Sequence, residues 1–349
     1  MRLQVIIPLI ILLIFSFLIF IFPFEIISSW LGHPTSVQET VLSTAFVYLV
    51  CLYYFRSKSS NKFIKLFVYE GMGIGTLSLF IVFFILLISL VLNISDIQKI
   101  FIFLMIFFPS IIYGFLNAKK VTVKQLKFSH SKIKNNLSFI FLSDIHIGSN
   151  NPKILKRIVP LINQQNPRFV LIGGDLIDSS SFKIDDLDEL KKINAPIYFV
   201  TGNHEYYIAD SQKHLDNFKN QNIRILDNQC ILEGQINIIG ISDNQKKDEK
   251  INKFEKLFNP DYYNLLLVHQ PSIWSSLKDK ANLTLSGHTH NGQIFPFNFI
   301  VKLQFPQIYG VYSYLKNYLY VSSGAATWGP KIRIGSKNEI LNIELFNNS

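Results

Sequence analysis

Long apolar runs separated by short polar stretches dominate the first 117 residues, and this pattern then stops. The runs cover residues 5–22, 41–55, 71–92 and 100–115. A helix of about 20 apolar residues crosses the hydrocarbon core of a bilayer, so the pattern predicts about four transmembrane helices. The second run is short and contains Ser43, Thr44 and Cys51, which leaves three spans with one interfacial helix as the alternative.

The polar stretches between these runs indicate an orientation. Arg2 precedes the first run, and the loop that follows that run contains neither Lys nor Arg. The next loop has four basic residues, the third has only Lys99, and Lys119 and Lys120 follow the last run. Because basic loops stay in the cytoplasm, both termini, and so the domain that follows the last run, should face the cytoplasm. A cleaved signal peptide is the alternative for the first run, but its length and the lack of a small-residue cleavage site favour a retained helix.

Residues 118–349 show a different pattern, in which short apolar runs alternate with segments of helical periodicity. Runs at 138–144, 169–175 and 197–203 read as buried strands, and 152–164 and 184–193 have helical periodicity. Further strands are expected at 223–226, 236–241, 265–269, 283–287, 318–322 and 340–345, with a short charged helix at 246–254. Strand–helix–strand repetition predicts a parallel sheet with helices packed against it, and because fewer helices separate the later strands, a mixed sheet or a two-sheet sandwich is expected. The chain is thus predicted to have a membrane region, 1–117, and a globular domain, 118–349.

Composition adds little to this division. The hydrophobic fraction of 49% reflects the membrane region, and the net charge of +10 fits anionic partners or a general abundance of Lys equally well. The two cysteines allow no disulfide framework, which is typical of a reducing compartment.

Polar clusters follow the strands of the globular domain and are the candidates for chemistry. The three early strands end in Ser-Asp-Ile-His-Ile-Gly, Gly-Gly-Asp-Leu-Ile-Asp and Thr-Gly-Asn-His-Glu, and two later ones in Val-His-Gln-Pro and Gly-His-Thr-His. Ligands bind at the carboxyl ends of strands in open α/β sheets. Five of the eight histidines fall in these clusters, so a metal site is favoured over isolated structural histidines.

The ordered set resembles the calcineurin-like metallophosphoesterase superfamily, whose pattern is Asp-x-His, Gly-Asp-x-x-Asp, Gly-Asn-His-Asp/Glu, His and Gly-His-x-His. All five motifs occur in order over residues 144–290. Two of the stretches more closely resemble the bacterial membrane-associated branch, although Asn291 stands where that branch usually has Gly. The resemblance implies a four-layer α-β-β-α sandwich of two mixed sheets.

The resemblance also implies roles for individual residues. One metal ion would be held by Asp144, His146 and His290, with Asp175 bridging to a second ion held by Asn203, His269 and His288. Asp178 would support these ligands, and His204 would face the substrate as an acid or hydrogen-bond donor. The cofactor would be two divalent ions, Mn, Fe or Zn, since mixed nitrogen and oxygen ligands suit these metals. A metal-bridged hydroxide would attack phosphorus in such an enzyme.

Three further side chains are weaker candidates for substrate binding. Tyr206 follows the third motif, and Lys331 and Arg333 lie beyond the strand at 318–322. Basic side chains there would suit a second phosphate or a head group. Ordinary packing and surface charge are the competing explanations.

The sequence therefore predicts a membrane-anchored, metal-dependent phosphoesterase acting on a phosphomonoester or phosphodiester. Its partners would be a lipid bilayer and a phosphorylated small molecule or lipid-linked substrate. The location would be a bacterial-type inner membrane, crossed several times, with the catalytic domain in the cytoplasm. Three alternatives stay open: a catalytically silent scaffold or regulatory metal-binding protein, a channel regulated by the domain, and a nucleotide or nucleic-acid phosphodiesterase. No basic-aromatic stripe supports nucleic-acid binding.

Overall fold

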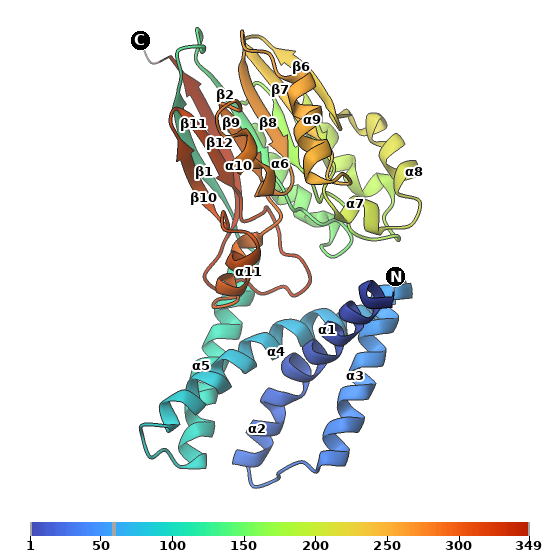
Figure 1. Cartoon of the computed structure of the whole chain (residues 1–349), viewed down its shortest axis with the longest axis vertical. Coiled ribbons are helices and arrows are strands. Elements are labelled where there is room, and N and C mark those ends of the chain that lie inside the picture. The colour runs from blue at the N-terminus through green and yellow to red at the C-terminus, as the bar shows by residue number, and fades with distance from the viewer. Residues whose placement is uncertain (1, 58–60, 348–349) are drawn as a thin grey trace. The chain divides into compact units, whose positions relative to one another are not determined.

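The computed structural model describes residues 2–57 and 61–347, and the chain divides into two compact units. The first unit comprises residues 1–117 together with the short segment Gly329–Ile334, and the second comprises Ala118–Trp328 and Gly335–Ser349. The chain therefore passes between the units at residues 117–118, 328–329 and 334–335. Figure 1 shows the helices of the first unit in blue to cyan and the sheets of the second in green to red.

The first unit consists of apolar helices. They are α1 (Arg2–Phe20), α2 (Phe22–Trp30), α3 (Val37–Ser57), α4 (Lys62–Ser89) and α5 (Asp96–Ala118). Within the described residues, four segments are long and apolar enough to cross a membrane, with α1 and α2 together forming the first. Each is longer than the apolar run that predicted it, because polar residues at the ends continue the helix. Asn61, for example, begins α4 by accepting hydrogen bonds from the amides of Phe63 and Ile64.

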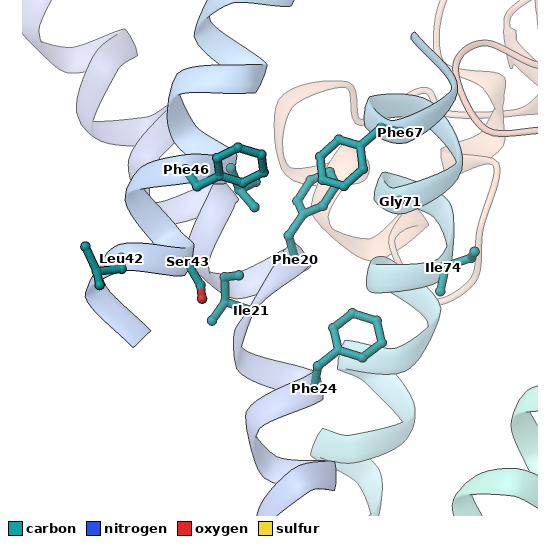
Figure 2. A pocket seen from close by; sticks show the side chains of 10 residues that line it. Phe20, Ile21, Phe24, Leu42, Ser43, Phe46, Phe67, Gly71 and Ile74 are labelled. Atoms are coloured by element: carbon teal, nitrogen blue, oxygen red, sulfur yellow. The ribbon is translucent and has the colours of Figure 1, made fainter. Parts of the chain in front are cut away.

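The outward surfaces of these helices are apolar. Large side chains such as Ile11, Phe46 and Phe83 are more than half exposed, as in helices that face lipid. A groove of about 590 Å³ opens between α1, α2, α3 and α4, and Ser43 is its one polar side chain. Phe20, Phe24, Phe46 and Phe67 line it in Figure 2. Such a lining suits a hydrocarbon chain better than water.

The segment Gly329–Ile334 packs among the helices of the first unit. The Arg333 amide donates to the carbonyl oxygen of Gly114 (3.0 Å), and Asn117 Nδ2 donates to the carbonyl oxygen of Arg333 (3.0 Å). A Cβ atom at Gly73 would lie 2.5 Å from Pro330, and one at Gly114 would lie 2.6 Å from Ile332. These two glycines therefore leave the space that the segment fills.

The second unit contains two six-stranded mixed sheets. The first has the order β1 (Val121–Ser129), β12 (Asn338–Phe346), β2 (Leu137–Leu142), β3 (Val170–Gly173), β4 (Ile197–Val200) and β5 (Ile223–Ile225). The second has the order β10 (Gly310–Tyr314), β11 (Asn317–Val321), β9 (Leu283–Ser286), β8 (Tyr263–Val268), β7 (Ile236–Ile241) and β6 (Gln229–Glu233). Strands β2 to β5 are parallel to one another, as are β7, β8, β9 and β11.

Helices cover the outer faces of both sheets. Those associated with the first sheet are η1 (Pro152–Ile154), α6 (Leu155–Asn163), η2 (Ile184–Lys192), α7 (His204–Tyr207), α8 (Ser211–Asp216) and η3 (Phe218–Gln221). Those in the second half are α9 (Lys247–Leu257), η4 (Pro271–Ile273), α10 (Trp274–Leu277), η5 (His290–Gly292) and α11 (Asn298–Gln304). In Figure 1, α9 lies in front of β7 and β8. The predicted helix at 184–193 is a 3₁₀ helix.

Successive side chains of a strand point to opposite faces of its sheet, so each sheet contributes to a core on both of its faces. Phe139 and Phe141 of β2 point into the core between the sheets, whereas Ile140 and Leu142 pack against the helices outside. The Phe139 and Phe169 rings stack at 4.9 Å in the inner core. The predicted four-layer sandwich of two mixed sheets is confirmed.

Candidate metal centre

The polar clusters of both sheets meet at the carboxyl ends of their central parallel strands. Each candidate residue directly follows a strand: Asp144 and His146 follow β2, Asp175 and Asp178 follow β3, Asn203 and His204 follow β4, His269 follows β8, and His288 and His290 follow β9. This is the edge at which open α/β sheets place their ligands.

Three of these side chains form a first group, and their potential ligand atoms all lie within 4.8 Å of one another. The Nε2 atoms of His146 and His290 are 3.2 Å apart. Asp144 Oδ1 lies 3.9 Å from His146 Nε2 and 3.5 Å from His290 Nε2. All three residues are buried, so one space receives two imidazole nitrogens and a carboxylate.

A second group combines Asp175, His269 and His288. Asp175 Oδ2 lies 3.0 Å from His269 Nε2, and His269 Nε2 lies 3.2 Å from His288 Nδ1. The other ring nitrogen of His269 donates to the carbonyl oxygen of Gly173 at 2.8 Å. This bond directs Nε2 toward the centre, as the outer hydrogen bond of a metal-binding histidine does.

Asp175 connects the two groups. Its Oδ2 atom is 3.8 Å from His146 Nε2 of the first group as well as 3.0 Å from His269 Nε2 of the second. Its Oδ1 atom accepts a hydrogen bond from the His204 amide at 2.9 Å. A carboxylate with two oxygens between two sets of nitrogens is suited to bridging two cations.

Asn203 and Asp178 lie beside these two groups. Asn203 Oδ1 is buried and has no hydrogen-bond donor within the part of the chain that the structure describes, which is the state of an oxygen reserved for a cation. Asp178 Oδ2 lies 3.3 Å from His146 Nδ1, the ring nitrogen that faces away from the first group. The Ser149 amide donates to Asp178 Oδ1 at 2.7 Å and fixes the carboxylate there.

The protonation states of the cluster reflect burial and mutual charge. Burial favours the neutral form of Asp175, but the neighbouring His269 and His204 outweigh it and hold the pKa of that carboxyl well below its usual range. Burial likewise opposes protonation of His269, yet Asp175 raises the pKa of its imidazole well above the usual value. Burial lowers the pKa of His288 to about 3. A cation held by Asp175 and His269 would require the His269 imidazole to be neutral.

His204 lies beside the first group and reaches the surface. Its ring centroid is 4.8 Å from that of His146, 5.3 Å from Tyr207 and 5.4 Å from Trp328. Burial lowers its pKa to about 4, with Asp175 acting in the opposite direction. Its side chain is 17% exposed, so His204 can meet a molecule that enters from solvent. Tyr207, which is 61% exposed, forms part of the same opening.

The weaker substrate candidates are placed differently. The hydroxyl of Tyr206 contacts Thr201 Oγ1, Ser242 Oγ and Asp227 Oδ2 at 2.8, 2.8 and 3.2 Å, so it holds the loop after β4. Lys331 and Arg333 belong to the segment in the helical unit, where Arg333 is fully buried. Substrate binding by these three residues stays a prediction.

Glu205 is a residue whose role the sequence analysis missed. It is fully buried, and its carboxylate accepts hydrogen bonds from the amides of Asp175 (3.0 Å), Ile177 (2.9 Å) and Gly202 (2.7 Å). It therefore ties the loop after β3 to the loop after β4. Burial and the nearby Asp175 raise its pKa to about 8. Its place beside His204 in the third motif was the available signal.

Comparisons with known proteins agree with this fold. Residues 137–292 match the family model of calcineurin-like phosphoesterases. A metallophosphoesterase of Helicobacter pylori is 38% identical over 239 residues, which are 64% of this chain and 64% of that protein. One of Campylobacter jejuni is 36% identical over 250 residues, covering 67% of this chain and 66% of the relative. A transmembrane protein with a metallophosphoesterase domain from Danio rerio is 33% identical over 261 residues, covering 67% and 60%.

The fold of the second unit is that of a metallophosphoesterase. Residues 137–292 match the calcineurin-like phosphoesterase family, and the resemblance stated from the motifs is confirmed. The alignments with these three relatives span between 60% and 66% of each relative's length. The family generally depends on two metal ions, and the described residues contain candidate ligand groups at Asp144, His146 and His290, at Asp175, His269 and His288, and at His146, Asp178 and His204.

Proposed function

We propose that this protein is a membrane-anchored phosphoesterase that uses two divalent metal ions to hydrolyse a phosphomonoester or phosphodiester. The observation that carries the proposal is the position of Asp175 between two groups of buried ligand atoms. Asp144, His146 and His290 would hold one ion, Asn203, His269 and His288 the other, and Asp175 would bridge them. Mn, Fe and Zn are the metals that such mixed nitrogen and oxygen ligands suit.

The bound ions would supply Lewis-acid activation of a water molecule and of the phosphoryl oxygens. The chain supplies orientation and proton transfer. Asp178 holds the His146 ring through Nδ1, and Gly173 holds the His269 ring, so both Nε2 atoms keep their direction. His204 would donate a hydrogen bond or a proton to the leaving oxygen, because it is the histidine that combines contact with the centre and access to solvent.

The proposed substrate is lipid-linked or lies close to a membrane. Four helices able to cross a bilayer support this, because they would keep the catalytic unit near lipid head groups. The loops after α2 and α4 contain neither Lys nor Arg, which supports an orientation in a bacterial-type inner membrane with the catalytic unit in the cytoplasm.

Hydrolysis by the full-length protein in detergent would test the enzymatic proposal. An aryl phosphodiester and its monoester are offered after chelation and again after addition of Mn. Asp175→Asn should lose bound metal and nearly all turnover, because the bridge between the groups is weakened. His204→Ala should keep its metal and lose about 10²- to 10⁴-fold in kcat. Metal content is measured for each variant beside kcat.

Two substitutions outside the cluster serve as matched controls. Asp216→Asn and His33→Ala remove the same groups from exposed positions and should change neither metal content nor turnover. A folded protein that holds two metals per chain and cleaves neither ester would contradict hydrolysis of generic esters. Turnover that survives complete chelation would contradict the metal-dependent mechanism itself.

A further inference from the structure

An exposed apolar segment follows the last histidine motif in the catalytic unit. Residues 295–303 expose five large apolar side chains: Phe295 (51%), Phe297 (38%), Phe299 (61%), Ile300 (51%) and Leu303 (85%). Among the described residues of that unit, the other large apolar side chains of comparable exposure are Tyr207, Leu232, Val311, Tyr314 and Leu315. Half of this exposed apolar surface is therefore gathered in nine consecutive residues, whereas single exposed side chains are ordinary.

The segment has the pattern of a helix that lies in a membrane interface. Phe299, Ile300 and Leu303 of α11 have the i, i+1, i+4 spacing of one helical face, and α11 has no buried residue. Lys302 is at the end of the same helix and has a long side chain that can reach phosphate groups while its methylenes stay among apolar atoms. Aromatic and aliphatic side chains beside Lys characterise interfacial helices.

The segment begins where the chain passes into the membrane-capable unit. Gln293 accepts a hydrogen bond from the Trp328 amide and donates one to the Trp328 carbonyl oxygen, both at 3.0 Å. Ser336 Oγ donates to the carbonyl oxygen of Gln293 at 3.0 Å. Residues 328 and 336 flank Gly329–Ile334, which belongs to the helical unit. Trp328 therefore directly precedes the segment Gly329–Ile334, and Ser336 lies two residues after it. Both bind Gln293, and Phe295 follows Gln293 by two residues.

Phe305, which follows the exposed segment, lies beside the proposed metal centre. The ring centroid of Phe305 lies 4.9 Å from that of His288. The exposed residues are therefore held between two fixed points, one beside the passage to the helices and one against a proposed metal ligand.

We propose that residues 295–303 insert their apolar side chains into the surface of the bilayer that holds the helices. Phe299, Ile300 and Leu303 enter the boundary between head groups and acyl chains, and Lys302 contacts anionic head groups. The proposal rests on the membrane location in the proposed function and not on hydrolysis. A bilayer is the partner that we assign to this apolar segment, because the same chain carries helices that can cross a membrane. The chain enters the helical unit directly after Trp328, which is hydrogen-bonded to Gln293.

Lipid quenching of site-specific fluorophores on the full-length protein tests this proposal. Cys51→Ala and Cys230→Ser remove the natural thiols, and Phe299→Cys or Leu303→Cys then receives an environment-sensitive nitrobenzoxadiazole group. The protein is placed in nanodiscs of phosphatidylethanolamine and phosphatidylglycerol, with or without doxyl-labelled lipid. The fluorophore at either position should emit at shorter wavelength than in water and be quenched about twofold or more by doxyl lipid, as expected for an interfacial depth.

Leu232→Cys is the matched control. Leu232 is an apolar residue of similar exposure (51%) on β6, at the opposite edge of the sheet from β10, the strand that follows α11. Its fluorophore should emit as in water and resist quenching. Unquenched, water-like emission at 299 and 303 would overturn the proposal.

Two other results would overturn it as well. Short-wavelength emission without quenching would mean that a protein surface covers the segment, and equal quenching at residue 232 would mean that contact is not specific to it. The readout needs no turnover, so its failure is distinguishable from failure of the proposed hydrolysis.

Discussion

Five of the seven proposed metal ligands have left-handed backbone conformations. The φ angles are 56° at Asp144, 51° at His146, 54° at Asp175, 73° at His288 and 49° at His290. Each such residue costs roughly 1 kcal/mol or more relative to an ordinary conformation. The turns let ligands that are two residues apart in sequence, such as 288 and 290, direct both side chains to the centre. Asn291 is also left-handed (φ 52°), a conformation that Asn adopts more readily than most residues other than Gly.

Close packing around Asp175 leads to a prediction at the residue scale. A Cβ atom at Gly202 would lie 2.1 Å from Asp175 Oδ1 and 2.7 Å from its amide nitrogen. Gly202→Ala should therefore displace the bridging carboxylate and weaken metal binding about 10- to 100-fold, as changes beside metal ligands do. Metal content after dialysis against a graded series of chelator concentrations measures the effect.

Gly310→Ala separates this effect from simple backbone strain. Gly310 has a φ of 89°, but an added Cβ would meet no atom within 4 Å. This variant should lose some thermal stability and keep its metal. If Gly202→Ala retained metal as well as Gly310→Ala does, the proposed position of Asp175 in the centre would be wrong.

Most elements of the catalytic unit could be predicted from the sequence because its central strands are buried on both faces. Strands such as β7 and β8 are fully buried and mostly apolar, each with a single Asn, whereas β1, β6 and β10 were not predicted. All three lie at sheet edges, where one face is partly exposed and the run is broken by polar residues such as Lys124 and Lys127 of β1. The packing of residues 329–334 among the helices has no periodic pattern that would indicate it.

The candidate site could be predicted in part for the same reason. The motifs end buried strands, so their convergence follows from the topology. The place of Glu205 in the third motif marks it as a candidate, but its hydrogen bonds to loop amides depend on the folded positions of two loops. At the element scale, Glu205→Gln should loosen both loops because an amide nitrogen must face a backbone N–H. The remaining amide oxygen can keep the two bonds to the Oε2 position, so at least the bond from the Ile177 amide is lost and a loss of about 1 to 3 kcal/mol is expected. Thermal unfolding of the full-length protein in detergent measures it.

Glu255→Gln is the control at this scale. Glu255 pairs with Lys280 on the surface at 2.6 Å, with both side chains about 40% exposed, so the change should cost no more than about 1 kcal/mol. Equal destabilisation by the two substitutions would contradict the role of Glu205 in joining the loops.

At the scale of the whole molecule, the orientation of the helices decides which substrates the centre can reach. The loop between α3 and α4 is flanked by Arg56, Lys62 and Lys65, whereas the sequence between α4 and α5 is free of basic residues and Lys99 of α5 pairs with Asp96 at 2.9 Å. Lys and Arg near the ends of spans determine orientation, so the α3–α4 loop should remain in the cytoplasm. The α2–α3 and α4–α5 loops should then face the opposite side, and the catalytic unit should share the cytoplasm with the α3–α4 loop.

Labelling of single cysteines by a membrane-impermeant maleimide on intact cells would test this orientation. In the background that lacks Cys51 and Cys230, His33→Cys and Asn93→Cys occupy exposed positions in the α2–α3 and α4–α5 loops, and Lys120→Cys follows α5. Residues 33 and 93 should be labelled on intact cells, and residue 120 only after permeabilisation. Labelling of 120 on intact cells, with 33 and 93 protected, would invert the topology and place the catalytic centre on the outer side. A lipid-linked ester of the outer leaflet would then be the substrate to consider, because the metal centre could not reach a cytoplasmic one.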